Sequence, residues 1–181
     1  MSARPSIRRT VTALAVTGAA ATAVVAAAGT AAAMPTDFRC TSSQVDTTLV
    51  AGSPGAGQRY AFVQFTAKPG ETCTLQGALP VALADAPGVT VTADPAAADA
   101  PSVTVTEGAP ASMLLHWTGI EAAESQVEPS SVTVTAPQTT TPRGDTSDPA
   151  ITLPWNQGPL DDSAEAHALT VGAVTAGPAQ P

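Results

Sequence analysis

The chain of 181 residues is dominated by short stretches in which apolar and polar residues alternate, with Gly and Pro between them. Three of these stretches are near-identical Val-Thr-Val-Thr motifs, at 89–92, 103–106 and 132–135. Alternation with a period of two places successive side chains on opposite faces of a β-strand, so valine is expected to face a core and threonine to face water. The motifs are unequally spaced along the chain, so they indicate separate strands rather than a solenoid repeat.

Further strands are expected where the alternation is less regular. They lie at 45–51, 59–66, 72–75 with a broken continuation at 79–84, 112–117, 151–153 and 168–175. The stretch 112–117 places Met113, Leu115 and Trp117 on the inner face. No window combines helical spacing with caps, and the nearest, 119–126, is too short. Eight or nine short strands with Gly/Pro turns predict an all-β fold, an immunoglobulin-like β-sandwich.

Residues 1–33 have the pattern of a secretory signal peptide. Three arginines precede an uncharged stretch rich in alanine, which ends in small residues directly before Met34. We therefore expect an N-terminal signal helix that is cleaved, which leaves 34–181 as a single β-sandwich domain with a flexible polar loop at 138–149. The uncharged stretch is long enough to span a bilayer, so retention as an anchor is the alternative.

The charge of the chain limits its partners. The formal net charge is -8, and loss of the arginine-bearing leader makes the mature chain more acidic still. Non-specific binding to nucleic acid or to an anionic membrane surface requires basic patches, so we expect no nucleic-acid partner. We also expect no membrane span in the mature chain. Aromatic residues make up only 3% of the sequence, which leaves little material for stacking on sugars.

The two cysteines are Cys40 and Cys73. Disulfides form in exported proteins, and an exported chain with two cysteines most simply joins them. A redox-active pair would be closer, typically as Cys-x-x-Cys. We therefore predict a structural disulfide between Cys40 and Cys73. In the chain-entropy model, closing a loop of roughly 34 residues stabilises the fold by about 3–4 kcal/mol.

Few residues are candidates for chemistry. His116 is expected on the outer face of its strand, without a role, because it points away from Met113 and Leu115. The acidic run from Asp161 through Asp162 and Glu165 to His167 could bind a divalent cation weakly, but a solvated acidic turn is the favoured interpretation, because Ca²⁺ sites need six to eight ligands. No nucleophile elbow or zinc-protease motif is present. The sequence therefore assigns no catalytic, cofactor-binding or metal-binding residue.

The polar segment 138–149 contains two short motifs. Thr139, Thr140 and Thr141 stand beside Pro142, a composition that suits O-glycosylation of a secreted loop. The tripeptide at 143–145 is Arg-Gly-Asp, which we interpret as a coincidence rather than as an adhesion motif.

Several motifs occur in an order that resembles a known family. They are the opening at 40–45, the strand at 62–66, the Cys-Thr-Leu-Gln-Gly element at 73–77, the turn at 107–111 and the strand at 114–118. Together they resemble the secreted actinobacterial family catalogued as domain of unknown function 4232, and the Cys-Thr-Leu-x-Gly element is the most specific of them. The resemblance covers nearly all of the mature chain.

The resemblance implies an exported, disulfide-bonded β-sandwich that is often attached to the cell envelope and has no established activity. It supports the pairing of Cys40 with Cys73. Members often carry a second cysteine pair in the C-terminal half, and this chain lacks both of those cysteines.

We therefore expect a non-enzymatic module, structural or binding, that is secreted to the extracellular space or the envelope surface and has an unknown cell-envelope or extracellular partner. The alternative is an extracellular protein that binds a small ligand or, weakly, a divalent metal. A hydrolase is less favoured.

Overall fold

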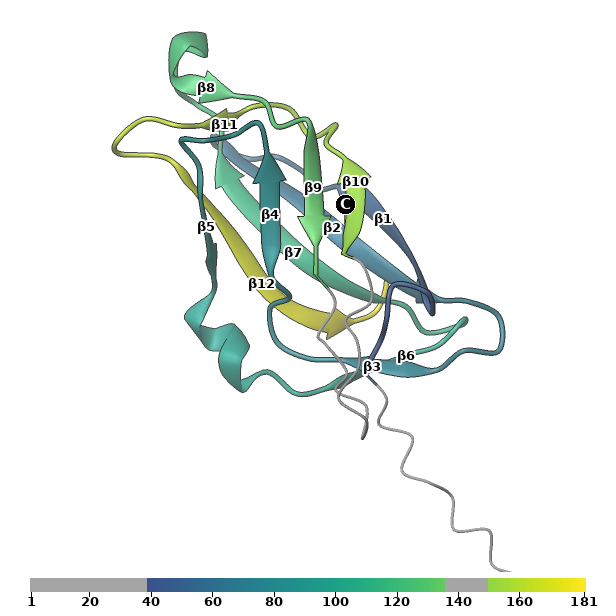
Figure 1. Ribbon diagram of the computed structural model, residues 1–181. Helices are drawn as coiled ribbons and strands as arrows, with labels where there is room; N and C mark the ends of the chain where they lie inside the picture. The colour runs from purple at the N-terminus through teal and green to yellow at the C-terminus, as the bar shows by residue number, and fades with distance from the viewer. Residues whose placement is uncertain (1–38, 136–149) are drawn as a thin grey trace, which may run out of the picture. The chain divides into compact units, whose positions relative to one another are not determined.

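The structure is a computed structural model that describes residues 39–135 and 150–181. Within these residues the fold is all-β, with twelve strands and two short 3-10 helices (Figure 1). The expected signal peptide at 1–33 lies outside the described residues. So does the expected polar loop at 138–149, with its threonines and its Arg-Gly-Asp motif.

The elements are named in chain order. They are β1 (Val45–Ala51), β2 (Gln58–Ala67), β3 (Cys73–Leu75), β4 (Val81–Ala84), β5 (Thr90–Ala93), η1 (Pro95–Asp99), β6 (Val103–Val105), β7 (Ala111–Thr118), η2 (Ala123–Ser125), β8 (Gln126–Val127), β9 (Ser131–Val134), β10 (Ile151–Pro154), β11 (Leu160–Asp161) and β12 (Ala168–Ala176). Across the described ranges, no helix is long and apolar enough to cross a membrane.

The largest sheet has five strands in the order β1-β2-β7-β12-β5. All neighbours are antiparallel except β12 and β5, which run parallel. The two long strands in its middle, β2 and β7, alternate between buried and partly exposed residues. Met113, Leu115 and Trp117 are buried on the inner face of β7, as the alternation predicted.

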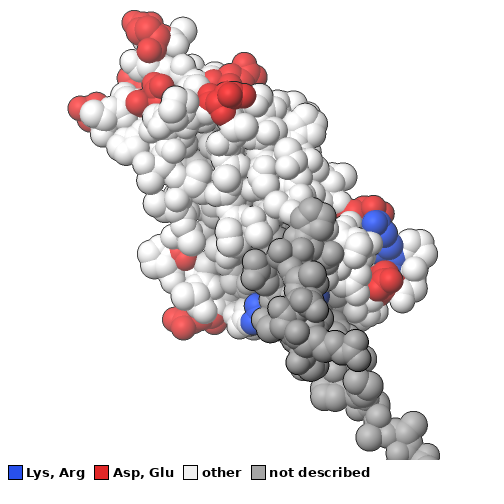
Figure 2. Space-filling model, in the orientation of Figure 1, with Lys and Arg blue, Asp and Glu red and all other residues white. Residues whose placement is uncertain are grey.

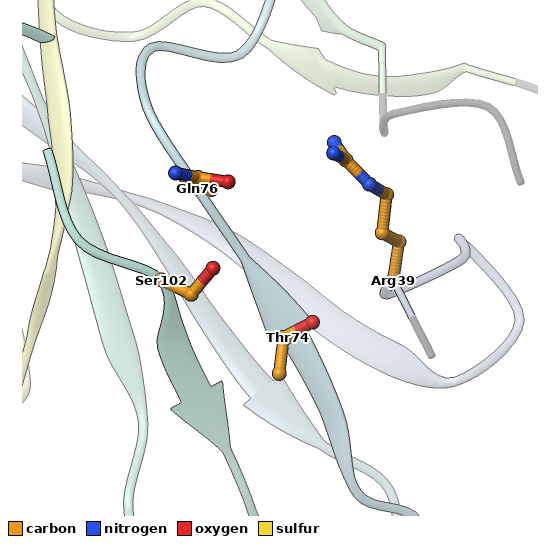
Figure 3. A pocket seen from close by; sticks show the side chains of 4 residues that line it. All are labelled: Arg39, Thr74, Gln76 and Ser102. Carbon is orange, nitrogen blue, oxygen red and sulfur yellow. The ribbon is translucent and has the colours of Figure 1, made fainter. Parts of the chain in front are cut away.

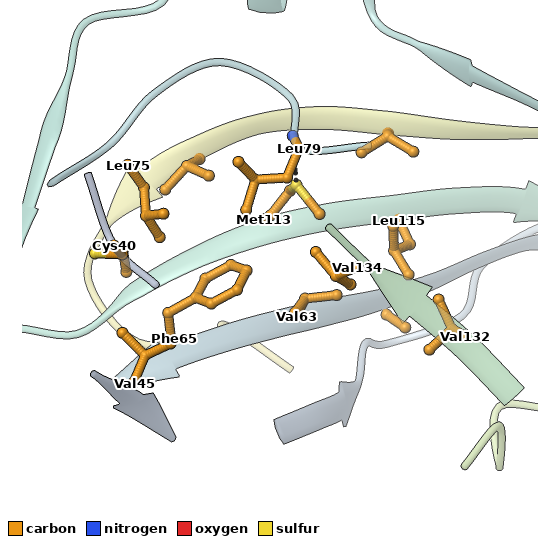
Figure 4. Packing of buried hydrophobic residues seen from close by; sticks show 14 of the residues in the cluster. Cys40, Val45, Val63, Phe65, Leu75, Leu79, Met113, Leu115, Val132 and Val134 are labelled. Carbon is orange, nitrogen blue, oxygen red and sulfur yellow. Dashed lines mark hydrogen bonds between the residues drawn. The ribbon is translucent and has the colours of Figure 1, made fainter. Parts of the chain in front are cut away.

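The hydrophobic core lies between this sheet and a three-stranded sheet in the order β10-β9-β4. Figure 4 shows Val63, Met113 and Leu115 of the large sheet close to Val132 and Val134 of β9. All five side chains are completely buried. Burial of one such side chain contributes about 1.5–3 kcal/mol, so this layer is the main source of stability.

Two of the three Val-Thr motifs behave as expected. The valines of 103–106 and 132–135 are buried, and Thr104 of β6 is exposed. The first motif, 89–92, forms β5 at the edge of the five-stranded sheet, and its Val91 is only partly buried.

The expected number of eight or nine strands is wrong, because the described residues form twelve. Two of the additional strands, β8 and β11, have two residues each and are too short to show alternation. The broken strand expected at 72–75 and 79–84 is also wrong. Its halves belong to different sheets, since β3 pairs with β6 and β4 pairs with β9. Gly77, with a φ of 69°, turns the chain between them.

Candidate binding site beside the disulfide

The predicted disulfide between Cys40 and Cys73 is present, with the two Cα atoms 4.8 Å apart. Both cysteines are completely buried. The Cys40 amide donates a 2.9 Å hydrogen bond to the Thr74 carbonyl, and Arg39 forms a parallel bridge with Thr74. Because β3 is in turn paired with β6, the disulfide holds Arg39 against the edge of this small sheet.

Four side chains from these segments line a surface hollow of about 280 Å³ (Figure 3). They are Arg39, Thr74, Gln76 and Ser102. A second hollow of about 490 Å³ shares Arg39 and Gln76 with the first. We call the two together the Arg39 hollow, because the shared residues make them neighbours on one surface.

The second part of the Arg39 hollow is lined by small residues. They are Gly77, Ala78, Ala93, Asp94, Pro95, Ala97 and Ala98. Asp94 caps η1, since its Oδ1 accepts a 2.9 Å hydrogen bond from the Ala96 amide. This wall is therefore largely apolar, with one fixed carboxylate beside it.

Arg39 supplies the positive charge of the hollow. Its side chain is exposed, and no ion pair joins it to a carboxylate within the described ranges. The Gln76 side-chain amide donates a 3.2 Å hydrogen bond to the Ala100 carbonyl, which fixes its orientation. In Figure 3 the oxygen end of Gln76 is turned to the side of the hollow on which Arg39 lies. The arrangement can bind an anion that also carries a hydrogen-bond donor.

The two histidines meet in a different hollow, of about 260 Å³, together with Glu165 and Thr118. β12 pairs with β7 so that Thr170 lies opposite His116, which brings the segment of His167 close. His116 lies on the outer face, as expected, although it is only partly exposed. No local pattern predicts that the two histidines lie in one hollow, because they are far apart along the chain.

The partners of the histidines are neutral groups. The His116 ring stacks on Tyr60, with ring centroids 4.9 Å apart, and its Nε2 is hydrogen-bonded to the Gln58 side chain. His167 Nδ1 is 2.9 Å from the Ser163 carbonyl oxygen. Neither histidine is bonded to a carboxylate or a hydroxyl in the described part of the chain, so they form no catalytic triad there. Nor do the described residues bring three or more His, Cys, Asp or Glu side chains into a group that could hold a metal ion.

The expectation of a solvated acidic turn at 161–167 is wrong for Asp161, which is only 2% exposed. Its carboxylate accepts hydrogen bonds of 3.0–3.1 Å from the backbone amides of Ile120 and Glu121 and from the Gln126 side chain. Burial raises the pKa of this carboxyl, but these hydrogen bonds outweigh burial and hold the pKa below its usual value. Asp161 is therefore a structural residue that ties β11 to the loop after β7.

Acidic residues gather at one end of the face shown in Figure 2, the end where Figure 1 places β8 and β11. The other end, where β3 and β6 lie, shows both basic and acidic side chains.

Fold and site together define an all-β, disulfide-stapled domain with a polar surface hollow beside the disulfide. The family model described as Domain of unknown function (DUF4232) matches residues 40–179. The chain belongs to this family. No match was found among curated proteins or among solved structures.

Proposed function

We propose that the chain is an exported, non-enzymatic binding module of the cell envelope, built as an immunoglobulin-like β-sandwich. The observation that carries the proposal is the Arg39 hollow, in which a cation without an ion-pair partner among the described residues stands beside neutral polar side chains. Two sheets that share one apolar core support the sandwich architecture. The leader pattern and the Cys40–Cys73 disulfide support export.

The hydrogen bonds of the histidines favour binding over catalysis. A general base needs a ring nitrogen within reach of a nucleophile or of the substrate proton. A ring nitrogen of His116 is instead hydrogen-bonded to a side-chain amide, and one of His167 to a backbone carbonyl. These contacts fix the two rings as parts of the sheet surface.

Retention on cell-envelope fragments tests the main proposal. The purified protein should co-sediment saturably with washed fragments from the bacterium that produces it. Arg39→Gln should weaken this retention by at least about tenfold, because a hydrogen-bonded charge is worth about 1.5–3 kcal/mol. Arg59→Gln is the matched control, since Arg59 is an exposed arginine outside the Arg39 hollow, and it should be retained like the parent. Absent retention, or equal retention of both variants, contradicts the proposal.

A further inference from the structure

The cation of the Arg39 hollow is a guanidinium, a group that recognises carboxylates. A guanidinium presents its N–H donors in a planar fork that matches the two oxygens of a carboxylate. Ser102 lies on the opposite side of the first hollow and adds a hydroxyl. Among the described residues, no acidic side chain lines this first part of the hollow, so none of them competes there with an incoming carboxylate for Arg39.

Gln76 restricts which chemical group of the ligand can lie next to its carboxylate. Its side-chain nitrogen is used in the bond to the Ala100 carbonyl, whereas its oxygen accepts no hydrogen bond from the residues that the structure describes. An oxygen left without a donor in a bound complex loses its hydrogen bond to water, which costs free energy. A ligand that fills the hollow therefore needs an N–H or O–H donor near its carboxylate.

The second part of the hollow restricts the body of the ligand. Ala78, Ala93 and Ala97 make it apolar, so an apolar side chain of the ligand can pack against it. Asp94 stands at this wall with its carboxylate fixed by the cap of η1. A second negative charge on the ligand would be repelled there, so the carboxylate of the ligand must lie at Arg39.

We propose that the Arg39 hollow binds the free C-terminus of a short peptide with apolar side chains. The terminal carboxylate pairs with Arg39, the last peptide N–H donates to the Gln76 oxygen, and an apolar side chain lies on the alanine wall. This inference rests on the proposed binding function and names the class of ligand for the same site. It involves no covalent step.

Titration followed by ¹H–¹⁵N NMR tests the proposal with N-acetyl-Ala-Ala as the probe. Amide shifts should concentrate at Arg39, Gln76, Ala78 and Ser102. The C-terminal amide of the same dipeptide, which replaces the carboxylate by a neutral group, should bind at least about tenfold more weakly. Acetate, a carboxylate without the peptide N–H, should also bind at least about tenfold more weakly, since one lost hydrogen bond costs about this much. Inorganic phosphate, which has O–H donors but neither the planar carboxylate nor the peptide, should bind more weakly than the dipeptide.

Three variants assign the binding to the hollow. Arg39→Gln should weaken binding of N-acetyl-Ala-Ala by at least about tenfold, and Arg39→Lys should lie between it and the parent, because lysine keeps the charge but loses the planar fork. Arg59→Gln should bind within about twofold of the parent. Arg39 is exposed, so its variants should give spectra of a folded protein with shifts confined to the hollow.

Three results would overturn the inference. They are equal binding of the acid and the amide, binding of inorganic phosphate as tight as that of the dipeptide, and no binding of the dipeptide at millimolar concentration. If envelope retention still depends on Arg39 in any of these cases, the proposed function stands and only the ligand class is wrong. If Arg39→Gln is retained on the envelope as well as the parent, the result counts against the proposed function itself.

Discussion

Replacement of Asp161 by asparagine should destabilise the protein although the side chain keeps its size. Asp161 is buried, and its carboxylate accepts hydrogen bonds from two backbone amides and from Gln126, with further support from the Thr118 hydroxyl. Asparagine carries no charge, so the hydrogen bonds that Ile120, Glu121 and Gln126 donate to Oδ1 would lose the charge that strengthens them. Its NH₂ group would replace Oδ2, which lies 3.1 Å from the Ile120 amide, so that two donors would face each other.

The size of the effect follows from these contacts. A hydrogen bond to a charged group contributes about 1.5–3 kcal/mol and one between neutral groups about 0.5–1.5 kcal/mol, so each of the bonds to Oδ1 weakens by about 1 kcal/mol when the charge is removed. We expect Asp161→Asn to lower the free energy of unfolding by about 2–3 kcal/mol at neutral pH. For a domain of this size, that corresponds to a fall in melting temperature of about 4–12 °C.

The loss should depend on pH in a defined direction. Hydrogen bonding holds the pKa of Asp161 in the folded state below its usual value, so the carboxylate stabilises the fold fully above the pKa of the unfolded chain. That stabilisation is lost as the pH falls through the folded pKa. The difference between parent and variant should therefore be constant from about pH 5 to 8 and shrink below about pH 4.

Urea unfolding followed by tryptophan fluorescence measures the effect. Trp117 and Trp155 pack with ring centroids 5.1 Å apart and are almost fully buried, so their emission reports on the core. Asp162→Asn is the matched control, because it removes the adjacent acid from a partly exposed position and should change stability by no more than about 0.5 kcal/mol. Equal losses at Asp161 and Asp162, or a difference that grows on acidification, would refute this reasoning.

Two further predictions concern the backbone of the fold. Cys40→Ala with Cys73→Ala should lower the free energy of unfolding by about 3–4 kcal/mol, measured by urea titration, and no change on removal of the disulfide would contradict its structural role. Gly57→Ala should cost about 1 kcal/mol or more, because Gly57 has a φ of 81° and an added Cβ would lie 1.9 Å from Ile120 Cγ2. In the background of Ile120→Ala the same change should cost less but not nothing, since the φ remains, and equal costs in both backgrounds would show that the clash does not matter.

The sequence predicts the parts of this fold that depend on local pattern. Met113 and Leu115 are buried because their strand alternates, and the same holds for the valines at 132 and 134. Cys40 and Cys73 could be paired without any structure, since an exported chain with two cysteines has one simple solution. In each case the signal lies in the spacing or number of residues of one type.

What the sequence does not predict depends on contacts between distant segments. Asp161 looks like any exposed acid in a polar run, yet its donors come from residues some 40 positions away. β12 pairs in parallel with β5, and no local pattern specifies this neighbour. The short helix η1 does have a local signal, although not one of alternation, because Asp94 before Pro95 is a typical start of a helix.

The candidate site also depends on contacts between distant segments, because it is assembled from segments joined by the disulfide. Arg39 carries no motif, and it gains a defined position only because its neighbour Cys40 is bonded to Cys73, the residue before Thr74. Ser102 directly precedes β6, which pairs with β3 and so completes the first hollow. Loss of the disulfide would release Arg39 from this edge before it disturbed the apolar layer between the two large sheets. Affinity for an anionic ligand should therefore be more sensitive to the loss of this bond than the fold is.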